Sequence, residues 1–414
     1  MHSSPFWTER DVLHVVQSMA QAQSGKSGRK VSETSLFLEI QRSDAFSPAQ
    51  IQALACEALH FFSLAPSEGT DDGLQAELAG QPEFAAWAKS IFARWNKAAI
   101  CFRSSGSTGI PTRHCFPIPL LGEEMHAAMP RFRSRRRIIS VMPVHHIYGM
   151  MYGPLLAKYL EVPLLFAPPL PLSSFFAMVR PGDLVVAFPL FWNALLTMRG
   201  DDAVTLFPED VAGLTATSPC PAEVLHSLIT PSHAGTRPLL ANITEIYGST
   251  ETNGIGLRRD GEAWYELFSC WKSETGAQGI RRIRRIHEDG TLGERLPLPD
   301  IAVWHDDRRF VPERRGDNAV QVGGINVYPE KVAALIRTHP LVRDCAVRLM
   351  RPEEGARLKA FIVPALPKEQ AAKAFGKSFH TWLAARLETA SRPKRITLGD
   401  ALPTNSIGKS SDWD

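Results

Sequence analysis

From residue 98 onward, short apolar runs that end at Gly or Pro alternate with stretches of helical character. The apolar runs include AAICF, RIISVMPV, VPLLFAP and DLVVAFP, and the helical stretches between them include MMYGPLLAKYL and LFWNALLTM. Strands that alternate with helices are typical of a largely parallel sheet whose two faces are both covered. The pattern therefore predicts an α/β fold, and it excludes a coiled coil, a collagen-like chain or a disordered chain.

The segment before this region, residues 1 to about 95, has the pattern of helices joined by polar connections. In SPAQIQALACEALHFF, Ser47 is a candidate cap, Pro48 stands at the first helical position, and apolar residues recur at helical spacing. With 414 residues, 44% of them hydrophobic and 21% charged, the chain can bury a large core without metal or disulfide staples.

A second change of pattern lies near Arg-Gly-Asp at residues 315–317. After it come AVQV, a helix over 329–338, the strands DCAVRLM and LKAFIVP, a long helix over about 368–389, and KRITL. This β-α-β-β-α-β order is typical of a small α+β domain. We therefore expect a large N-terminal domain over 1–316, with mostly parallel sheets and packed helices, and a small mobile C-terminal domain over 317–414.

Charge, cysteine usage and hydropathy limit the class of protein. The 46 basic and 43 acidic residues do not favour a nucleic-acid binder. The six cysteines form no CxxC pair and no cluster with zinc spacing, so reduced thiols in a cytoplasmic protein are the simplest interpretation. The N-terminus lacks the basic start and apolar core of a signal peptide. The uncharged stretch 162–179 contains prolines throughout, which predicts a buried strand and a turn rather than a membrane span.

Three short motifs carry residue types that suit phosphate chemistry. SSGSTGIP, at residues 104–111, offers backbone N–H groups and hydroxyls to an anion. IYGSTET, at residues 246–252, places a carboxylate beside hydroxyls, where it could hold Mg²⁺ against phosphates. LPTNSIGK, at residues 402–409, ends on a lysine that could meet a developing oxyanion. Taken singly, each motif is more typical of an ordinary turn or a solvated terminus than of a phosphate site.

The order of the motifs resembles that of the AMP-forming adenylating superfamily, which contains acyl-CoA synthetases, the adenylation domains of peptide synthetases, and luciferases. That family carries SSGSTGxPK, P-x-x-H-x-x-G, YGxTE, GRxDxxIKxxGxxVxPxEVE and LPxxxxGK. This chain has SSGSTGIPTR, PVHHIYG, YGSTET, RRGDNAVQVGGINVYPEKV and LPTNSIGK in the same order, over about residues 98–409.

The resemblance implies a role for each matching residue. In catalysis, Thr250 would contact the α-phosphate, Glu251 would hold Mg²⁺, His146 would lie near the substrate carboxylate, and Lys409 would bridge that carboxylate and the α-phosphate. The residues implied in nucleotide binding are those of the phosphate loop, those around adenine, and those at the ribose: Ser104, Ser105, Gly106, Ser107, Thr108, Gly109, Ser218, Tyr247, Asp300 and Arg315. Asp317 would be the hinge between the two domains.

The implied function is that of an acid–thiol ligase. ATP would activate a carboxylic acid to an acyl-adenylate, and the thiol of coenzyme A, or of a phosphopantetheine arm on an acyl carrier protein, would then take the acyl group. We expect a small aromatic acid such as a hydroxybenzoate, in secondary-metabolite biosynthesis; a fatty or other aliphatic acid is the alternative. Thr112 and Gln321 replace two lysines of the family pattern. A non-catalytic adenylate-binding protein is therefore a rival, as is a kinase-like phosphotransferase that releases ADP.

Two arginine runs, within 131–137 and 281–285, contain nine of the 46 basic residues. Such runs are typical of a solvated face, or of a surface that steers coenzyme A or an acidic carrier protein. Trp192 and His145 are expected to be packed rather than to contact a ligand.

Overall fold

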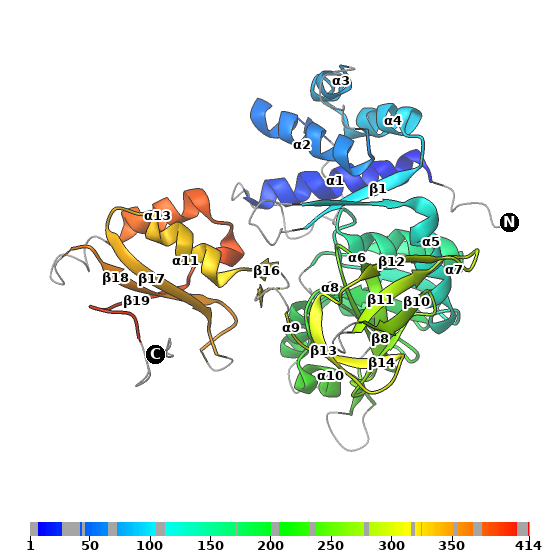
Figure 1. Cartoon of the computed structure of the whole chain (residues 1–414). Coiled ribbons are helices and arrows are strands. Elements are labelled where there is room, and N and C mark those ends of the chain that lie inside the picture. Colours follow the sequence, from blue (N-terminus) through cyan, green and yellow to red (C-terminus); the bar gives the residue numbers. More distant parts are fainter. Residues whose placement is uncertain are drawn as a thin grey trace. The chain divides into compact units, whose positions relative to one another are not determined.

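The computed structural model describes residues 7–26, 42–43, 46–64, 73–104, 112–169, 173–199, 207–231, 237–276, 281–315, 319–323, 325–351, 354–366, 375–403 and 413. The described residues divide into two compact units (Figure 1). The larger unit takes its residues from 1–104, 113–298 and 302–312, and the smaller from 105–112, 299–301 and 313–414.

Among the described residues, four helices open the larger unit and pack together beside its first hairpin (Figure 1). They are α1 (Glu9–Lys26), α2 (Pro48–Phe61), α3 (Leu74–Ala79) and α4 (Phe84–Arg94). The expected start of α2 is confirmed, because the Ser47 hydroxyl accepts from the Gln50 N–H while the Gln50 side chain accepts from the Ser47 N–H. Trp95, edge-on to both Trp7 and Phe62, lies in the core of this part.

Among the described residues, the main sheet has the strand order β13-β14-β9-β8-β7-β6-β5-β3-β4, and it belongs to the larger unit except for residues 300–301 of β13 and 313–315 of β14. Strands β4, β3, β5, β6 and β7 are parallel neighbours, and β8, β9 and β14 continue the sheet in antiparallel pairs. The expected α/β class is therefore confirmed. The strands are β3 (Arg137–Ser140), β4 (Leu164–Phe166), β5 (Asp183–Ala187), β6 (Ala212–Thr215), β7 (Asn242–Ser249), β8 (Asn253–Arg259), β9 (Tyr265–Leu267), β13 (Asp300–Trp304) and β14 (Arg309–Arg315).

Both faces of the parallel strands are covered, because successive side chains enter two separate apolar cores. In β5, Leu184 and Val186 belong to one core, and Val185 and Ala187 to the other. The second core also contains Trp192, which is fully buried as expected. The helices of this part are α5 (Ile118–Ala128), η2 (Met129–Arg131), α6 (Ile147–Met150), the π-helical turn η3 (Met151–Leu155), α7 (Leu156–Leu160), α8 (Ser173–Met178), α9 (Pro189–Arg199) and α10 (Ala222–Ile229).

Two further antiparallel sheets belong to the larger unit. One is the hairpin of β1 (Ala99–Arg103) and β2 (Arg113–Pro117), and the other contains β10 (Trp271–Thr275), β11 (Arg281–Ile286) and β12 (Leu292–Leu296). In the hairpin, Cys101 lies directly opposite Cys115 and the two form a disulfide. The expectation of six reduced thiols is wrong for this pair, because strand register rather than sequence spacing brings the two residues together. The free cysteines are Cys56, Cys220, Cys270 and Cys345.

The smaller unit has the expected order of helices and strands from α11 onward, but two strands, β15 and β16, precede that helix instead of one. Its strands β17 and β18 pair antiparallel and β19 joins β18 in parallel, while α11 packs on β17. The helix expected over about 368–389 is shorter among the described residues, because Gly376 and Leu387 both take non-helical backbone angles. The elements are β15 (Val320–Val322), β16 (Ile325–Val327), α11 (Pro329–Arg337), β17 (Val342–Leu349), β18 (Leu358–Pro364), α13 (Lys377–Arg386), η5 (Thr389–Ser391) and β19 (Arg395–Leu398).

Two further expectations concern the chain as a whole. The boundary expected at residue 316 falls in 316–318, outside the described residues, so it stays a prediction. Within the described ranges, none of the helices combines the length and the apolar character that a membrane crossing needs.

Candidate active site

Two of the sequence motifs, and the segment TSPCP around Ser218 at residues 217–221, follow or end strands of the parallel part of the main sheet. PVHHIYG follows β3, TSPCP follows β6, and YGSTET ends β7, with β5 and β6 lying between β3 and β7. Parallel strands end at one edge of a sheet, spaced roughly 5 Å apart. Ligands of open α/β sheets bind outside this carboxyl edge. The structure therefore brings His146, Ser218, Thr250 and Glu251 to the edge where a ligand is expected.

His146 caps the start of α6 in an extended backbone conformation and exposes its side chain. Its ring lies against that of His145, with 4.3 Å between the ring centroids. The Nδ1 atom of His145 shares a hydrogen bond of 2.8 Å with the Ser18 hydroxyl of α1. His145 is thus packed as expected, whereas His146 faces outward.

The turn that carries His146 is fixed to the sheet by its neighbours. The Tyr148 hydroxyl donates to the Ala187 carbonyl at the end of β5, at 3.1 Å. The turn also needs its glycine, because a Cβ on Gly149 would lie 2.1 Å from the Pro143 carbonyl oxygen. This close approach of backbone to backbone explains why the P-x-x-H-x-x-G pattern ends on glycine here.

The YGSTET segment forms the tip of the β7–β8 hairpin, with a register shift at Tyr247 and Gly248. The hydroxyls of Ser249 and Thr252 share a hydrogen bond of 3.1 Å, and the Thr252 N–H donates to the Ser249 hydroxyl at 3.3 Å. These bonds close the turn that contains Thr250 and Glu251. The Glu251 side chain is 49% exposed, so its carboxylate is accessible to a ligand.

The donor set at this tip fits a magnesium ion that arrives with a nucleotide. Mg²⁺ takes one or two protein carboxylates and completes its coordination with phosphate oxygens and water. In the described part of the chain, no group of three or more His, Cys, Asp and Glu side chains could hold a metal ion by itself. Exposed Glu251 beside hydroxyl groups therefore offers the kind of donor that a nucleotide-bound magnesium ion would take.

The β1–β2 hairpin brings the start of the phosphate-loop motif to the same carboxylate. His114 of β2 places its Nε2 atom 3.3 Å from the Ser104 hydroxyl and 3.9 Å from Glu251 Oε1. Sequence reasoning missed His114; the signal available was its position just after Thr112, which replaces the family lysine. The rest of the predicted loop, Ser105, Gly106, Ser107, Thr108 and Gly109, lies outside the described residues.

The remaining predicted residues of the larger unit lie near β6 and β7. Tyr247 is buried among aromatic rings, with centroid distances of 5.2 Å to Phe310 and 5.6 Å to Tyr265. Ser218 lies partly exposed in the bend after β6, next to Thr217 with its positive φ of 79°. The roles predicted for Tyr247 and Ser218 at adenine stay predictions.

Three predicted residues are not brought to this edge by the described structure. Asp300 opens β13 and is partly exposed. Arg315 ends β14, but its side chain lies outside the described residues, as does the whole of Lys409. Their roles at the ribose, the phosphates and the carboxylate also stay predictions.

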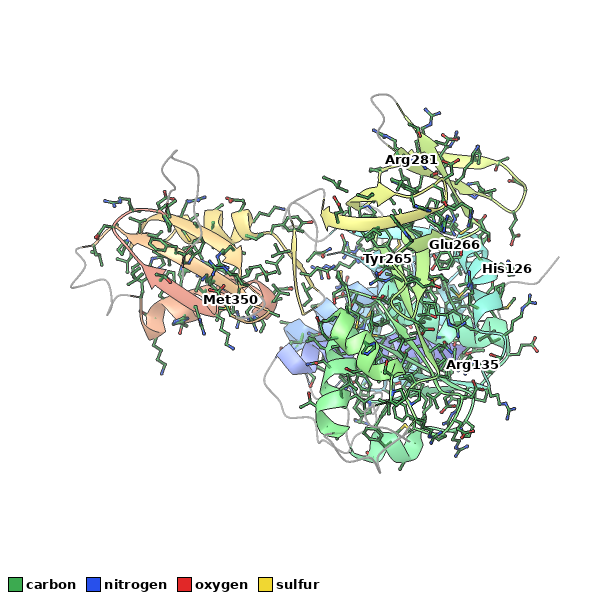
Figure 2. All side chains as sticks on the ribbon, turned by 90° about the horizontal axis from the view of Figure 1, so that it is seen from below. His126, Arg135, Tyr265, Glu266, Arg281 and Met350 are labelled. Atoms are coloured by element: carbon green, nitrogen blue, oxygen red, sulfur yellow. A yellow bond between two sulfur atoms is a disulfide. The ribbon has the colours of Figure 1, made fainter. Side chains whose placement is uncertain are left out.

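Six of the nine arginines in the two runs, all of them within the described ranges, form ion pairs with carboxylate side chains. Arg137 donates to the buried Asp183 through Nε at 2.9 Å and Nη2 at 2.6 Å, and the buried Arg285 donates to Glu123 at 2.9 Å. Further ion pairs are Arg131–Glu266, Arg135–Asp210, Arg281–Asp307 and Arg284–Glu274. In Figure 2 the labelled Arg135 and Arg281 lie at opposite ends of the larger unit.

A second residue missed by sequence reasoning is Glu124 of α5, whose side chain is fully buried. Burial raises the pKa of this carboxyl group to about 7, although Arg285 and two hydrogen bonds act in the opposite direction. Those bonds come from the Gly254 N–H at 2.9 Å and the Tyr152 hydroxyl at 3.2 Å. Glu124 was hidden in the sequence because nothing in its spacing distinguishes it from the solvated acids of an ordinary helix.

Comparison with known proteins agrees with this architecture. The chain aligns over 96% of its length with o-succinylbenzoate CoA synthetase from Bacillus subtilis, covering 80% of that chain at a TM-score of 0.61 and 15% identity, which shows a common fold. The family described as AMP-binding enzyme C-terminal domain matches residues 331–409.

Several relatives match most of the sequence, and two 4-coumarate–CoA ligases are among them. The 4-coumarate–CoA ligase of Rhodobacter capsulatus is 34% identical over 354 residues, which are 83% of this chain and 84% of that protein. The 4-coumarate–CoA ligase of Halorhodospira halophila is 32% identical over 312 residues, 75% of each chain. The class is thus that of the AMP-forming acid–thiol ligases. The chain belongs to the AMP-forming adenylating superfamily, as the order of its motifs predicted.

Proposed function

We propose that the protein activates a small aromatic carboxylic acid with ATP and transfers the acyl group to coenzyme A. The observation that carries this proposal is the identity of about a third, over most of the chain, to ligases named for an aromatic acid and for coenzyme A. The arrangement of His146, Thr250 and Glu251 at the carboxyl edge of the sheet supports it.

The reaction has two steps. A carboxylate oxygen of the acid attacks the α-phosphorus of ATP; a new P–O bond forms, and the bond to the oxygen of the leaving pyrophosphate breaks. The sulfur of the deprotonated thiol then attacks the acyl carbon, and AMP leaves with the electron pair of the C–O bond. Since two anions must meet in the first step, the protein contributes positioning and charge neutralisation.

The residues at the edge suit these tasks. Thr250 directs its hydroxyl to the α-phosphate, and Glu251 holds a magnesium ion whose positive charge lowers the repulsion between the anions. The exposed His146 meets the substrate carboxylate. His114, close to both Ser104 and Glu251, takes over part of the role of the missing loop lysine. Lys409 bridges the carboxylate and the α-phosphate during adenylation.

A product assay tests the proposal against its rivals. The protein is incubated with Mg·ATP and a panel of acids that includes hydroxybenzoates, 4-coumarate and fatty acids, with coenzyme A or a phosphopantetheine-bearing carrier protein as acceptor. We expect AMP and pyrophosphate with an aromatic acid, and an aryl-CoA detected by mass spectrometry. A thioester formed with aliphatic acids alone, or on the carrier protein alone, contradicts the corresponding part of the proposal.

Other products point to the other classes. Acid-dependent release of ADP instead of AMP identifies a kinase-like phosphotransferase. Calorimetric binding of ATP and of an acyl-adenylate mimic, with no AMP formed from any acid, identifies a non-catalytic adenylate-binding protein.

A lysine pair tests the assigned chemistry within the same assay. Lys409→Ala should lose adenylation and keep its thermal unfolding transition, because the lysine acts only when the carboxylate meets the α-phosphate. Lys394→Ala, which removes an exposed lysine of the smaller unit, is the matched control and should behave as the wild type. Full activity of Lys409→Ala would refute the role given to that residue.

A further inference from the structure

Helix α5 carries a carboxyl group that is entirely shielded from solvent. The Glu124 side chain is 0% exposed, and each of its oxygens accepts one hydrogen bond. Oε2 accepts from the Gly254 N–H, and Oε1 accepts from the Tyr152 hydroxyl. Burying a carboxyl group is costly even when it is hydrogen-bonded, and an apolar side chain would fill the same space without that cost. The two partners therefore indicate what the group does.

The first partner belongs to the hairpin that contains Thr250 and Glu251. Gly254 lies in β8 directly after the tip, and its carbonyl accepts from the Trp271 indole N–H at 2.8 Å. A Cβ on Gly254 would lie 2.5 Å from Glu124 Oε1, so the strand can approach α5 this closely only at a glycine. The base of the tip is thus held on one side by Glu124 and on the other by Trp271.

The second partner belongs to the helix that begins after His146. Tyr152 lies in the π-helical turn η3, which continues α6 without a break. π-Helical turns inside α-helices occur frequently at functional sites. The Tyr152 ring packs against that of Tyr148, whose hydroxyl is bonded to the end of β5. Glu124 consequently connects the helix that starts at His146 with the hairpin that ends β7.

The charges around Glu124 show that this carboxyl group is not simply one half of an ion pair. Arg285 of β11 faces it, but the Arg285 Nε atom donates to the neighbouring Glu123 at 2.9 Å. Cys270 and Tyr152 also face the group, and both are buried. Burial exceeds the effect of Arg285, so the pKa of Glu124 is raised.

We propose that Glu124 is a positioning residue for adenylation, which holds the hairpin of Thr250 and Glu251 in register with the helix of His146. This inference rests on the proposed function, because it takes these three residues as the groups that meet the nucleotide and the acid. A displacement of about 1 Å in a reacting group can lower a rate by about 100-fold. One buried link between two site elements is therefore enough to control the rate.

Two substitutions at Glu124 separate its hydrogen bonds from its volume. Glu124→Gln keeps the shape, an acceptor oxygen for the Gly254 N–H and a polar partner for Tyr152. Glu124→Leu has a similar volume and neither bond. We expect Glu124→Gln to keep a kcat close to that of the wild type, and Glu124→Leu to lower kcat by about 100-fold and to require more Mg²⁺ for half-maximal rate.

Two further variants test the two connections one at a time. Tyr152→Phe removes only the hydrogen bond between Glu124 and the helix that begins after His146. It should therefore raise the KM for the acid and leave the Mg²⁺ requirement unchanged. Gly254→Ala forces a methyl group against Glu124 Oε1 and displaces the hairpin, so it should raise the Mg²⁺ requirement and leave the KM for the acid unchanged. These variants keep the proposal testable if Glu124→Leu fails to fold.

All variants are measured by acid-dependent AMP formation well below their melting temperatures, and Glu288→Gln serves as the matched control on the surface. A Glu124→Leu variant that melts earlier but keeps the wild-type kcat and Mg²⁺ requirement would show a structural role only and overturn the proposal. Equal losses in Glu124→Gln and Glu124→Leu would also overturn it. If the wild type itself forms no AMP with any acid, the proposed function fails first, and that result is distinct from the two above.

Discussion

The turn after His146 can bring its backbone close to Pro143 only because residue 149 is glycine and has no side chain. Replacing Gly149 with alanine tests whether this close approach is needed for activity. A Cβ at this position would lie 2.1 Å from the Pro143 carbonyl oxygen and 2.9 Å from its carbonyl carbon. Both atoms belong to the backbone, so no side-chain rotation relieves the contact. The turn must open by about 1 Å to reach the shortest separation, 3.0 Å, that real Cβ atoms adopt.

The size of the effect follows from this displacement. Moving a group that meets the substrate by about 1 Å lowers the rate by about 100-fold, or about 2.7 kcal/mol of transition-state stabilisation. The added methyl group should also lower the free energy of unfolding by about 1–3 kcal/mol. The matched control is Gly153→Ala in the next turn, where a Cβ would lie 3.5 Å from Ser140 Oγ, an ordinary contact.

The assay is acid-dependent pyrophosphate release at saturating Mg·ATP, with thermal unfolding recorded for each variant. We expect Gly149→Ala to be folded at the assay temperature but slow, and Gly153→Ala to resemble the wild type. A wild-type rate in Gly149→Ala, or an equal loss in Gly153→Ala, would refute the reasoning.

Three other predictions concern single residues. His114→Ala should raise the KM for Mg·ATP with an unchanged circular dichroism spectrum, because it removes the contacts that His114 makes with Ser104 and with Glu251; an unchanged KM takes His114 out of the site. Asp183→Asn leaves the Arg137 guanidinium without its buried counter-ion. Urea unfolding should therefore show a free energy of unfolding lower by about 3–5 kcal/mol, and a decrease below about 1 kcal/mol contradicts this. Burial, aided by Arg10, lowers the pKa of His14 from 6.5 to about 4. Between pH 6.5 and about pH 4 the unfolded state therefore binds more protons than the folded state, and the free energy of unfolding falls as the pH falls. In His14→Phe the melting temperature should fall less steeply with decreasing pH in this range than in the wild type. The same dependence on pH in both proteins would contradict this prediction.

Features that depend on neighbours along the chain were predictable from the sequence. The start of α2 was predictable, because a reciprocal cap needs only Ser47 and Gln50, three positions apart. The strands β3 and β5 were predictable as well, because a short apolar run bounded by turn residues is typical of a strand buried on both faces. The start of α13 was not predictable, because the pattern of apolar residues does not show the non-helical backbone at Gly376.

Features that depend on strand register were hidden. Cys101 and Cys115 meet because β1 and β2 pair in a register that places them opposite each other. The same hairpin turns His114 toward Ser104 and Glu251, although Glu251 lies far along the chain. The ion-pair partners of the arginine runs were also hidden, since Asp183 and Glu123 come from other elements.

The sequence by itself determined the family, the α/β class and the order in which the site residues occur. These properties follow from residue types at short spacings, and such spacings are set by the geometry of the turn or strand that carries them. The tertiary structure alone decided that His146, Ser218, Thr250 and Glu251 reach one edge of a sheet. It also decided that Glu124 is buried between the hairpin and the helix, because burial and hydrogen-bond partners depend on how distant segments pack.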